Sequence, residues 1–476
     1  MIYFFGDRKN EIVAAKSIKN LSDRDIHKLE WLFSKKLINS LKIKGKFIGT
    51  RPFNITPWST NAVEITQNMG LNKLSRIELY KNSNIIKDYD SMTETKISGL
   101  NQNIFKIEIE PKKKIFIKNI NNYNTEEGLS LSVEEVNYLD KLSKKLGRLL
   151  TDSEVFGFSQ INSEHCRHKI FNGKFVLNGI LKKNSLFELI KKTSLLNRNS
   201  IISAYKDNVA FVDGPIINQF SPKYGDKPSL YKTKKIKSVI SLKAETHNFP
   251  TTVEPFSGAA TGSGGEIRDR LAGGKGSIPL AGTAVYMTPY PRLNESEYEK
   301  KVPARAWLYQ KPADILIKAS NGASDFGNKF GQPLICGSIL TFEHIESEEI
   351  LSYDKVIMLA GGVGFGKKND SIKEKPKKDE LVVILGGDNY RIGMGGAAVS
   401  SSVTGSNINS LELNAVQRSN PEMQKRVSNV IRALVEKSNN PIISIHDHGA
   451  GGHLNCLTEL MEETGGDINI DKFPIG

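Results

Sequence analysis

The stretch that decides the fold is residues 243–269, which read KAETHNFPTTVEPFSGAATGSGGEIRD. An apolar run from Val239 to Leu242 precedes it and is typical of a buried strand. Residues 258–265 have almost no side chains, and we expect them to form a turn whose backbone N–H groups close on an anion. Residues 266–269 are typical of the first turn of a helix. The order of strand, turn and helix predicts an α/β (or α+β) fold with a ligand site at the strand end.

Side chains of complementary chemistry follow the predicted strand. Lys243 could neutralise a phosphate, and Glu245 and Asp269 offer the hard oxygen ligands that suit Mg²⁺. His247 could move a proton near neutral pH. Together these residues predict a Mg-nucleotide site for phosphoryl transfer.

The same stretch also has ordinary structural interpretations. Glycine runs are more often flexible loops than phosphate cradles. Glu266 and Arg270 stand four residues apart and could simply pair on a helix surface. A lone Lys, Glu or His is usually structural or solvated. The joint placement of all three at a strand end favours the functional interpretation.

Composition indicates a globular protein with several domains. The chain has 476 residues, of which 38% are hydrophobic and 25% charged, so we expect two to four domains. No apolar run reaches the roughly 18 residues that cross a bilayer, and we expect no membrane association. The widely spaced Cys166, Cys336 and Cys456 indicate a reducing cytoplasm and no zinc site. The net charge of +14 is scattered without interleaved aromatic residues, so we expect no nucleic-acid partner.

Two capped helices are expected before residues 162–169, which read NSEHCRHK. Ser132 and Thr151 each precede a glutamate by three residues, and Gly147 suits the end of the first helix. Within NSEHCRHK, His165, Cys166 and His168 are too close together to form a tetrahedral zinc site without help from elsewhere. No strand–turn–helix elbow surrounds the cysteine, so we do not expect it to be a nucleophile.

The last quarter of the chain contains further glycine turns. Residues 361–367, GGVGFGK, nearly match a Walker A loop, but Lys368 replaces the Ser or Thr that would bind magnesium. We therefore interpret the match as accidental and expect no phosphate-binding loop there. Asn420 and Pro421 are typical of a helix start. Asp447 precedes a glycine turn, where it could bind a metal or simply cap the turn. Strands are expected at residues 355–360, 381–385 and 441–447.

Several stretches resemble one enzyme family, including residues 56–78, 324–338 (SDFGNKFGQPLICGS) and 415–423 (AVQRSNPEM) besides the three described next. Residues 243–269 are similar to the signature of the large, single-chain phosphoribosylformylglycinamidine synthases, ATP-dependent ligases of purine biosynthesis that take nitrogen from glutamine. NSEHCRHKIFN (162–172) resembles the linker motif of that family, and HDHGAGG (446–452) also matches. Phe249 departs from the pattern, because the family often has a second histidine there. The resemblance implies the N-terminal portion of such an enzyme, since the second catalytic copy and the glutaminase domain are missing from this chain.

The resemblance also implies a domain order. Residues 1–115 would form a PurS-like N-terminal domain, and residues 116–175 a helical linker. Residues 176–350 would be the N-terminal subdomain of an aminoimidazole-ribotide-synthetase-like (PurM-like) unit that holds ATP and Mg²⁺. Residues 351–476 would be its truncated C-terminal subdomain.

The family motifs imply roles for the matched residues. His247 would be the proton acceptor, with His165 stabilising charge or steering ammonia. The Mg²⁺ ligands would be Glu245, Asp269 and Asp447. The substrate contacts would be Thr246, Asn248, Arg268 and Gln417. The nucleotide contacts would be Lys243, His168, Gly258, Ala259, Ala260, Thr261, Gly262, Ser263, Gly264, Gly265, Glu266, Ile267, Arg268, Asp269, Cys336, Gly337 and Ser338.

The implied reaction is the ATP-driven conversion of phosphoribosylformylglycinamide to its amidine. ATP would phosphorylate the formamide oxygen, and ammonia would displace phosphate. The ammonia would come from a glutaminase that is not present in this chain. A second copy of the chain or a complementing polypeptide could cover the face that normally meets the duplicate half. Two rival hypotheses remain: a nucleotide-binding but inactive fragment, and a small-molecule kinase of the same superfamily.

Overall fold

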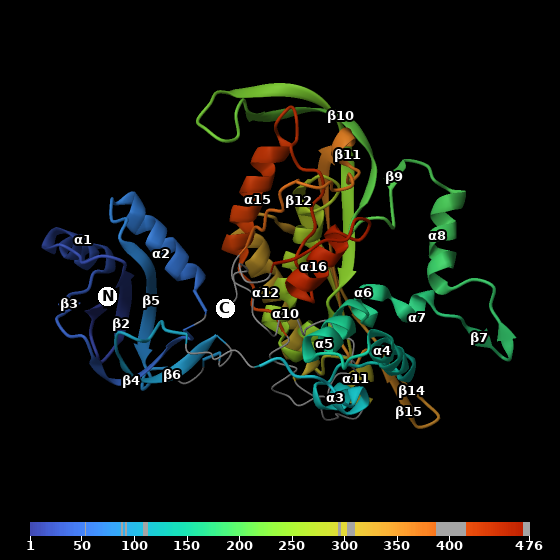
Figure 1. Ribbon diagram of the computed structural model, residues 1–476, viewed down its shortest axis with the longest axis horizontal. Coiled ribbons are helices and arrows are strands. Elements are labelled where there is room, and N and C mark those ends of the chain that lie inside the picture. The colour runs from blue at the N-terminus through green and yellow to red at the C-terminus, as the bar shows by residue number, and fades with distance from the viewer. Residues whose placement is uncertain are drawn as a thin grey trace. The chain divides into compact units, whose positions relative to one another are not determined.

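The computed structural model describes residues 1–52, 54–86, 89–90, 93–107, 113–293, 297–301, 310–386 and 416–469. The chain divides into two compact units, with the boundary between Lys113 and Lys114 (Figure 1). Each unit has its own six-stranded sheet, hydrophobic core and helices. This combination confirms the predicted α/β (α+β) class.

The larger unit is built on a sheet with the strand order β13-β12-β16-β11-β10-β9. Neighbouring strands are antiparallel, except that β12 and β13 are parallel. The strand expected before Lys243 is confirmed as part of β11, a central strand. The six strands are β9 (Ile201–Ser203), β10 (Ala210–Pro222), β11 (Tyr231–Thr246), β12 (Ile278–Thr288), β13 (Leu334–Thr341) and β16 (Ile357–Lys367).

Helices cover one face of this sheet. Helices α9 (Asn248–Val253), α10 (Pro255–Leu271) and α12 (Pro312–Phe330) pack on the strands, and α15 (Pro421–Val435) packs on α10 and α12 (Figure 1). Small residues dominate the contact, because Ala259 of α10 meets Ala319 of α12 in one buried cluster. The helix expected to start at Asn420 is confirmed as α15, with the Asn420 side chain accepting a hydrogen bond from the backbone of Met423.

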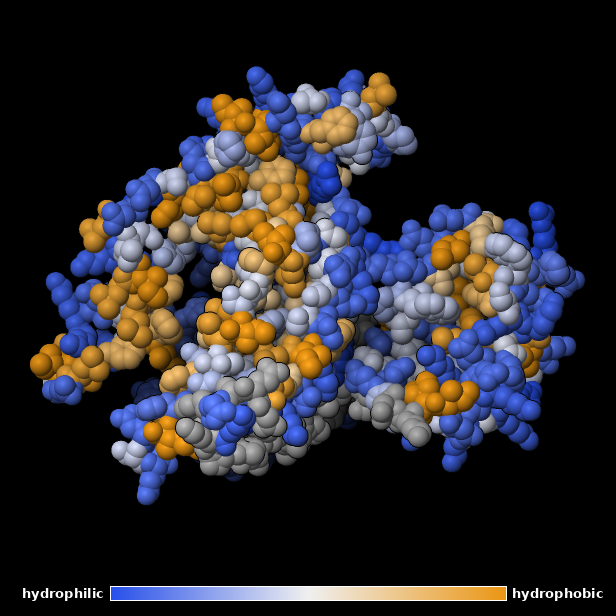
Figure 2. Space-filling view, turned by 180° about the vertical axis from the view of Figure 1, so that it is seen from behind, coloured by the Kyte–Doolittle hydropathy of each residue, from blue (hydrophilic) through white to orange (hydrophobic). Residues whose placement is uncertain are grey.

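The opposite face of the sheet exposes apolar side chains. Leu242 and Val363 are paired across β11 and β16, and they are 38% and 37% exposed. Leu340 of β13 is 48% exposed. Side chains alternate along a strand, so Leu242 points away from Lys243, which contacts α10. Figure 2 shows hydrophobic side chains gathered over the larger unit when it is seen from behind.

The two predicted capping boxes are confirmed. Ser132 and Thr151 each accept a bond from the backbone N–H of the glutamate three residues on, and that glutamate bonds back to the cap. Gly147 ends the first helix in the left-handed region, with φ +66°. Within the described ranges, every helix is too short or too polar to cross a bilayer. The other elements of this unit are α3 (Ile120–Glu126), α4 (Val133–Leu146), α5 (Asp152–Ile161), α6 (Glu164–Arg167), α7 (Lys169–Asn172), β7 (Val176–Leu177), β8 (Ile180–Leu181), α8 (Leu186–Leu196), α11 (Glu297–Lys301), β14 (Glu343–Glu346), β15 (Glu349–Ser352), η1 (Lys368–Asp370) and α16 (Gly452–Leu460).

The smaller unit is an antiparallel sheet in the order β3-β1-β2-β5-β4-β6. Alternate residues of β2 enter two different cores: Ile12 on one face, and Val13 with the helix residues Leu29 and Ala62 on the other. Both faces of the sheet are therefore buried. Its elements are β1 (Ile2–Gly6), β2 (Glu11–Ser17), α1 (Asp23–Phe33), β3 (Leu37–Ile38), β4 (Ile43–Thr50), α2 (Pro57–Asn68), β5 (Leu74–Asn82) and β6 (Glu94–Leu100).

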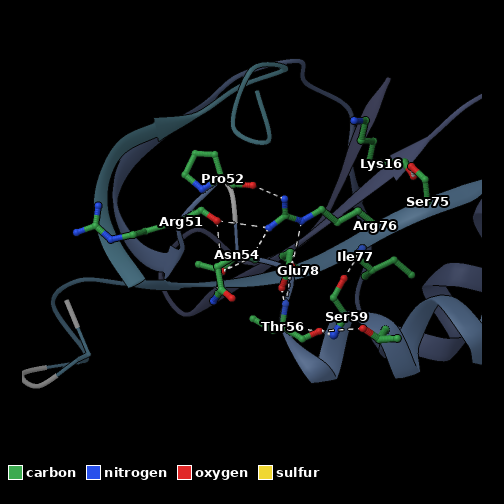
Figure 3. Close-up of polar contacts among 12 residues, drawn as sticks. Lys16, Arg51, Pro52, Asn54, Thr56, Ser59, Ser75, Arg76, Ile77 and Glu78 are labelled. Atoms are coloured by element: carbon green, nitrogen blue, oxygen red, sulfur yellow. Dashed lines mark hydrogen bonds and ion pairs between the residues drawn. The ribbon is translucent and has the colours of Figure 1, made fainter. Parts of the chain in front are cut away.

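A buried arginine in this unit holds the loop between β4 and α2. The Arg76 guanidinium donates to the carbonyl oxygens of Pro52 at 2.6 Å and Asn54 at 2.5 Å, and to Glu78 at 3.1 Å (Figure 3). The Thr56 hydroxyl donates to Glu78 at 2.6 Å while capping α2. Because both charges are paired and hydrogen-bonded, the network is structural and fixes the loop.

The predicted glycine-rich turn at residues 258–265 is wrong. These residues lie inside α10, so their backbone N–H groups are used within the helix and cannot close on an anion. The glycines permit close packing instead. A Cβ on Gly264 would lie 2.8 Å from the Phe326 ring, and one on Gly322 would overlap the backbone of Phe256. The sequence signal for a loop and for a tightly packed helix is the same: side chains are missing.

Three further predictions concern strands. The Walker-like residues 361–367 are part of β16, which continues the strand expected at residues 355–360. They do not form a phosphate-binding loop, which confirms that the match to the Walker A motif is accidental. The strands predicted at residues 381–385 and 441–447 are wrong, because these segments have no regular secondary structure. Both are apolar runs, but a strand also needs a neighbour to pair with, and only the fold supplies one.

Candidate functional site

An acidic group forms where β11 ends beside α10. The Lys243 ammonium makes an ion pair with Asp269 and lies 3.7 Å from the Glu245 carboxylate. The Asn208 side chain, from the bend before β10, donates to Asp447 at 3.0 Å and to Asp269 at 3.4 Å. The structure therefore brings together the three predicted metal ligands from segments up to about 200 residues apart.

Burial and mutual repulsion shape the charges of this group. Burial raises the pKa of Asp269 well above its ordinary value, and the nearby charges of Asp447 and Glu245 raise it further. Burial likewise raises the pKa of Glu245. Burial alone would lower the pKa of Lys243, but its carboxylate neighbours outweigh this effect and raise it. The lysine therefore keeps its charge, whereas burial disfavours the ionised forms of Asp269 and Glu245.

The carboxylate oxygens of this group are chemically suited to a divalent cation. Three carboxylates repel one another, and a hard cation relieves that repulsion. Across the described ranges, however, no three His, Cys, Asp or Glu side chains stand close enough to hold a metal as they are. Here the Lys243 ammonium is the cation that pairs with Asp269.

Two histidines lie close enough to charged residues of this site for their pKa values to be affected. Burial lowers the pKa of His247 to about 4, and the charges of Arg268 and His165 contribute. Its Nδ1 is buried and has no hydrogen-bond partner among the described residues. Burial also lowers the pKa of His165, on α6, and Lys243 is one of the charges that it senses. Both imidazoles are therefore neutral near pH 7 and able to accept a proton.

Comparisons with known proteins point to one enzyme family. The model of the formylglycinamide ribonucleotide amidotransferase linker domain matches residues 120–169, and that of the AIR synthase related protein C-terminal domain matches residues 377–476. The probable phosphoribosylformylglycinamidine synthase of Arabidopsis thaliana, chloroplastic/mitochondrial, is 36% identical over 460 residues, which cover 90% of this chain and 32% of the relative. The phosphoribosylformylglycinamidine synthase of Dictyostelium discoideum is 35% identical over 461 residues, covering 90% and 34%.

This chain is a relative of the phosphoribosylformylglycinamidine synthases. It spans about one third of the length of the two relatives above. Among solved structures it is similar to T. maritima PurL complexed with FGAR, with 23% identity, a TM-score of 0.43 and coverage of 69% of this chain and 42% of that one. T. maritima PurL complexed with ATP is 21% identical, with a TM-score of 0.41 and coverage of 69% and 40%.

Other predicted site residues of this synthase relative have structural partners. The Asn248 side chain accepts a bond from the Met358 backbone at 3.1 Å. Arg268 lies 3.9 Å from Asp447 and donates to Gln424 at 3.2 Å. These contacts hold α9 and α10 against β16 and α15. The roles predicted for Asn248 and Arg268 toward substrate stay predictions.

Glu266 is paired in the interior and not on a helix surface. It makes an ion pair with Arg270 and accepts from the Gln332 amide at 2.7 Å, and its side chain and that of Arg270 are at most 1% exposed. Burial raises the pKa of Glu266 to about 7. A nucleotide contact from Glu266 would therefore disrupt a buried pair.

The structure does not bring every predicted contact to the acidic group. Cys336 lies on β13, where its thiol bonds to Thr283 at 3.3 Å. Thr283 alternates with Ala284, which packs toward α12, so Cys336 is on the sheet face opposite to Lys243. His168 ends α6 with φ +49°, and its ring stacks on Phe187 at 6.3 Å between centroids. Four other predicted residues lie as follows: Gly337 and Ser338 are exposed on β13, Thr246 ends β11, and the Gln417 carbonyl accepts from Thr261 at 3.2 Å.

Sequence reasoning missed Asn208 and Gln424. Asn208 lies in the bend that precedes β10, and no local signal marks it as a site residue, because its two acceptors come from distant segments of the chain. Gln424 lies on the apolar face of α15, where its amide donates to the Gly264 carbonyl at 2.9 Å. Nothing in the local sequence around Gln424 signals that contact.

Proposed function

We propose that this chain carries the synthetase chemistry of phosphoribosylformylglycinamidine formation. It would use ATP to convert phosphoribosylformylglycinamide to the amidine, which makes it a ligase that forms a C–N bond. The observation that carries the proposal is the gathering of Lys243, Asp269 and Asp447 beside two neutral histidines, in a chain whose relatives bear that name. The relatives are about three times as long, so the complete activity is part of the proposal.

Each residue would have a simple physical task. The Lys243 ammonium would bind a phosphate oxygen once the nucleotide displaces it from Asp269. Glu245, Asp269 and Asp447 would hold Mg²⁺, which supplies charge neutralisation for the triphosphate when bound. Neutral His247 would accept a proton from the ammonia as it adds to the activated formamide carbon. Electrostatic placement of these groups would provide most of the rate.

The domain order stays part of the proposal. Residues 1–115 would be the PurS-like domain and residues 116–175 the linker, which the linker match and the boundary between compact units support. Residues 176–350 and 351–476 would be the two subdomains of the catalytic unit, and the second family match supports the latter.

Three further parts of the proposal concern surroundings and partners. Ammonia would come from a separate glutaminase. The exposed apolar face around Leu242 and Val363 would be covered by a second copy of the chain or by a complementing polypeptide. We also propose the cytoplasm as the location, for which the absence of a disulfide among the three cysteines is support.

The purified chain tests the proposal directly. It is incubated with phosphoribosylformylglycinamide, ATP, Mg²⁺ and ammonium, and the amidine and ADP are measured. Equal amounts of the two products support the synthetase. ATP binding by calorimetry without turnover favours the rival hypothesis of an inactive fragment. ADP formed together with a phosphorylated small molecule in a substrate screen would instead indicate a kinase.

A further inference from the structure

The bend before β10 contributes a side chain that joins two of the carboxylates. Asn208 Nδ2 lies 3.0 Å from Asp447 Oδ1 and 3.4 Å from Asp269 Oδ1. A primary amide carries two N–H donors, so one group can serve two acceptors at once. Asp269 comes from α10 and Asp447 from the segment before α16, and these segments are 178 positions apart along the chain.

The backbone on both sides of Asn208 is anchored. Asp207 makes an ion pair with Lys373 at 2.7 Å, and it accepts the backbone N–H of Gly274 at 2.7 Å. Val209 is 3% exposed and packs against Phe211. Gly274 closely follows α10, so the same bend is tied to the helix that carries Asp269. The contacts of Asp207 and Val209 therefore fix the backbone at Asn208, and this fixes the position of its amide beside the carboxylates.

The Lys243 ammonium pairs with Asp269 and Arg268 lies 3.9 Å from Asp447, but only the amide contacts both acids at once among the contacts described above. A donor shared by the two carboxylates offsets their mutual repulsion and holds them in one arrangement before a cation binds. The donating nitrogen faces both acids, and the opposite orientation of the amide would place its oxygen against two carboxylates. The amide thus lowers the cost of holding a pair of anionic ligands ready.

We propose that Asn208 is a positioning residue that holds Asp269 and Asp447 together for a divalent cation, an inference that rests on the proposed function. The amide does not touch the reacting atoms. It acts on cation affinity through the two carboxylates, and it has little effect on the nucleotide itself.

The test replaces Asn208 by leucine, which has a similar volume and no donor, in the full chain. Mn²⁺ is the probe, and its affinity is measured by electron paramagnetic resonance with ATP present; affinity for ATP in EDTA is measured by calorimetry. We expect the Kd of Mn²⁺ to rise about tenfold or more, which is the loss of one hydrogen bond to a charged group. The Kd of metal-free ATP is expected to change less than about twofold. A role confined to folding would weaken both affinities equally, and that result would overturn the proposal.

A matched control and a second variant complete the design. Asn124 of α3 is also an amide donor, but it donates to a backbone carbonyl, that of Leu131 at 3.1 Å, and it makes no contact with the support of Asn208 described above. Asn124→Leu should leave the Kd of Mn²⁺ unchanged. Asn208→Ser retains one donor and should recover part of the affinity, and it serves if the leucine variant fails to fold. Mn²⁺ affinity at the wild-type level in both Asn208 variants would overturn the proposal.

Failure of the proposed function can be told apart from failure of this inference. If the wild-type chain binds neither ATP nor Mn²⁺, the proposed function fails. Crystal structures of wild type and a folded Asn208 variant then decide the positioning role. An increased separation of Asp269 and Asp447 in the variant supports it, and an unchanged separation overturns it.

Discussion

Replacing Gly258 by alanine tests whether the glycine run is a helix packed on its neighbours. A Cβ at this position would lie 2.5 Å from the backbone nitrogen of Thr251 and would overlap the carbonyl group of Pro250. That is about 1 Å closer than an ordinary van der Waals contact, and the obstacle is backbone, which cannot rotate away. Helix α10 would have to move from α9 by a similar distance.

The magnitude follows from two opposing effects. Forcing an extra carbon into a packed interior costs up to about 3 kcal/mol. Alanine has the higher helix propensity, so replacing glycine by alanine inside a helix raises the free energy of unfolding by about 1 kcal/mol. The net loss in free energy of unfolding is therefore about 2 kcal/mol. Gly157 in α5 is the matched control, because a Cβ there meets only a flexible methyl group of Leu454 at 3.3 Å. Gly157→Ala should be neutral or stabilising.

Urea titrations followed by circular dichroism measure both variants, with ATP affinity as the second readout. We expect Gly258→Ala to be about 2 kcal/mol less stable than the wild type. A Gly258→Ala variant with wild-type stability but much weaker ATP binding would refute the helix argument. It would restore the interpretation of residues 258–265 as a phosphate-binding turn.

Three other changes test the site and the exposed sheet face. Asp269→Asn removes a predicted Mg²⁺ ligand and should weaken Mg-ATP binding about tenfold or more without unfolding the chain; unchanged affinity by calorimetry would remove Asp269 from the site. In the folded protein the pKa of His247 is about 4, whereas the ordinary value is 6.5. Between these two pH values the unfolded state therefore binds more protons than the folded state. The free energy of unfolding is expected to fall as the pH drops through this range, by up to roughly 3 kcal/mol. Urea midpoints from pH 4 to 7 should lose this slope in His247→Asn and keep it in His344→Asn, whose side chain is 54% exposed. Leu242→Lys with Val363→Lys should reduce any self-association seen by sedimentation velocity, and an unchanged distribution would mean that this face is not the contact.

Local features of the sequence predicted local structure well. The capping boxes at Ser132 and Thr151, and the cap at Asn420, were predicted because a helix end depends on residues within one turn of it. The strand before Lys243 was predicted for a similar reason, since a run of apolar residues is a local signal. The candidate ligands Glu245, Asp269 and Asp447 were chosen by residue type and motif, and the structure brings their side chains together.

The features that were missed depend on distant partners. A glycine run has no side chains in a loop or in a packed helix, and only the neighbours Pro250 and Phe326 distinguish the two. The apolar run at residues 441–447 could not become a strand without a neighbour to pair with. Its last residue nevertheless reaches the acidic group.

From the sequence alone one could determine the mixed fold class, the helix ends and the family resemblance. The sequence also identified the residue types of an acidic site that is expected to bind Mg²⁺ and a nucleotide. The tertiary structure alone decided that α10 is a buried helix, that Glu266 is paired in the interior, and that Asn208 bridges two acids. The physical reason is distance along the chain. Caps and periodic patterns act over a few residues, whereas close packing, desolvation and charge repulsion arise only when remote segments meet.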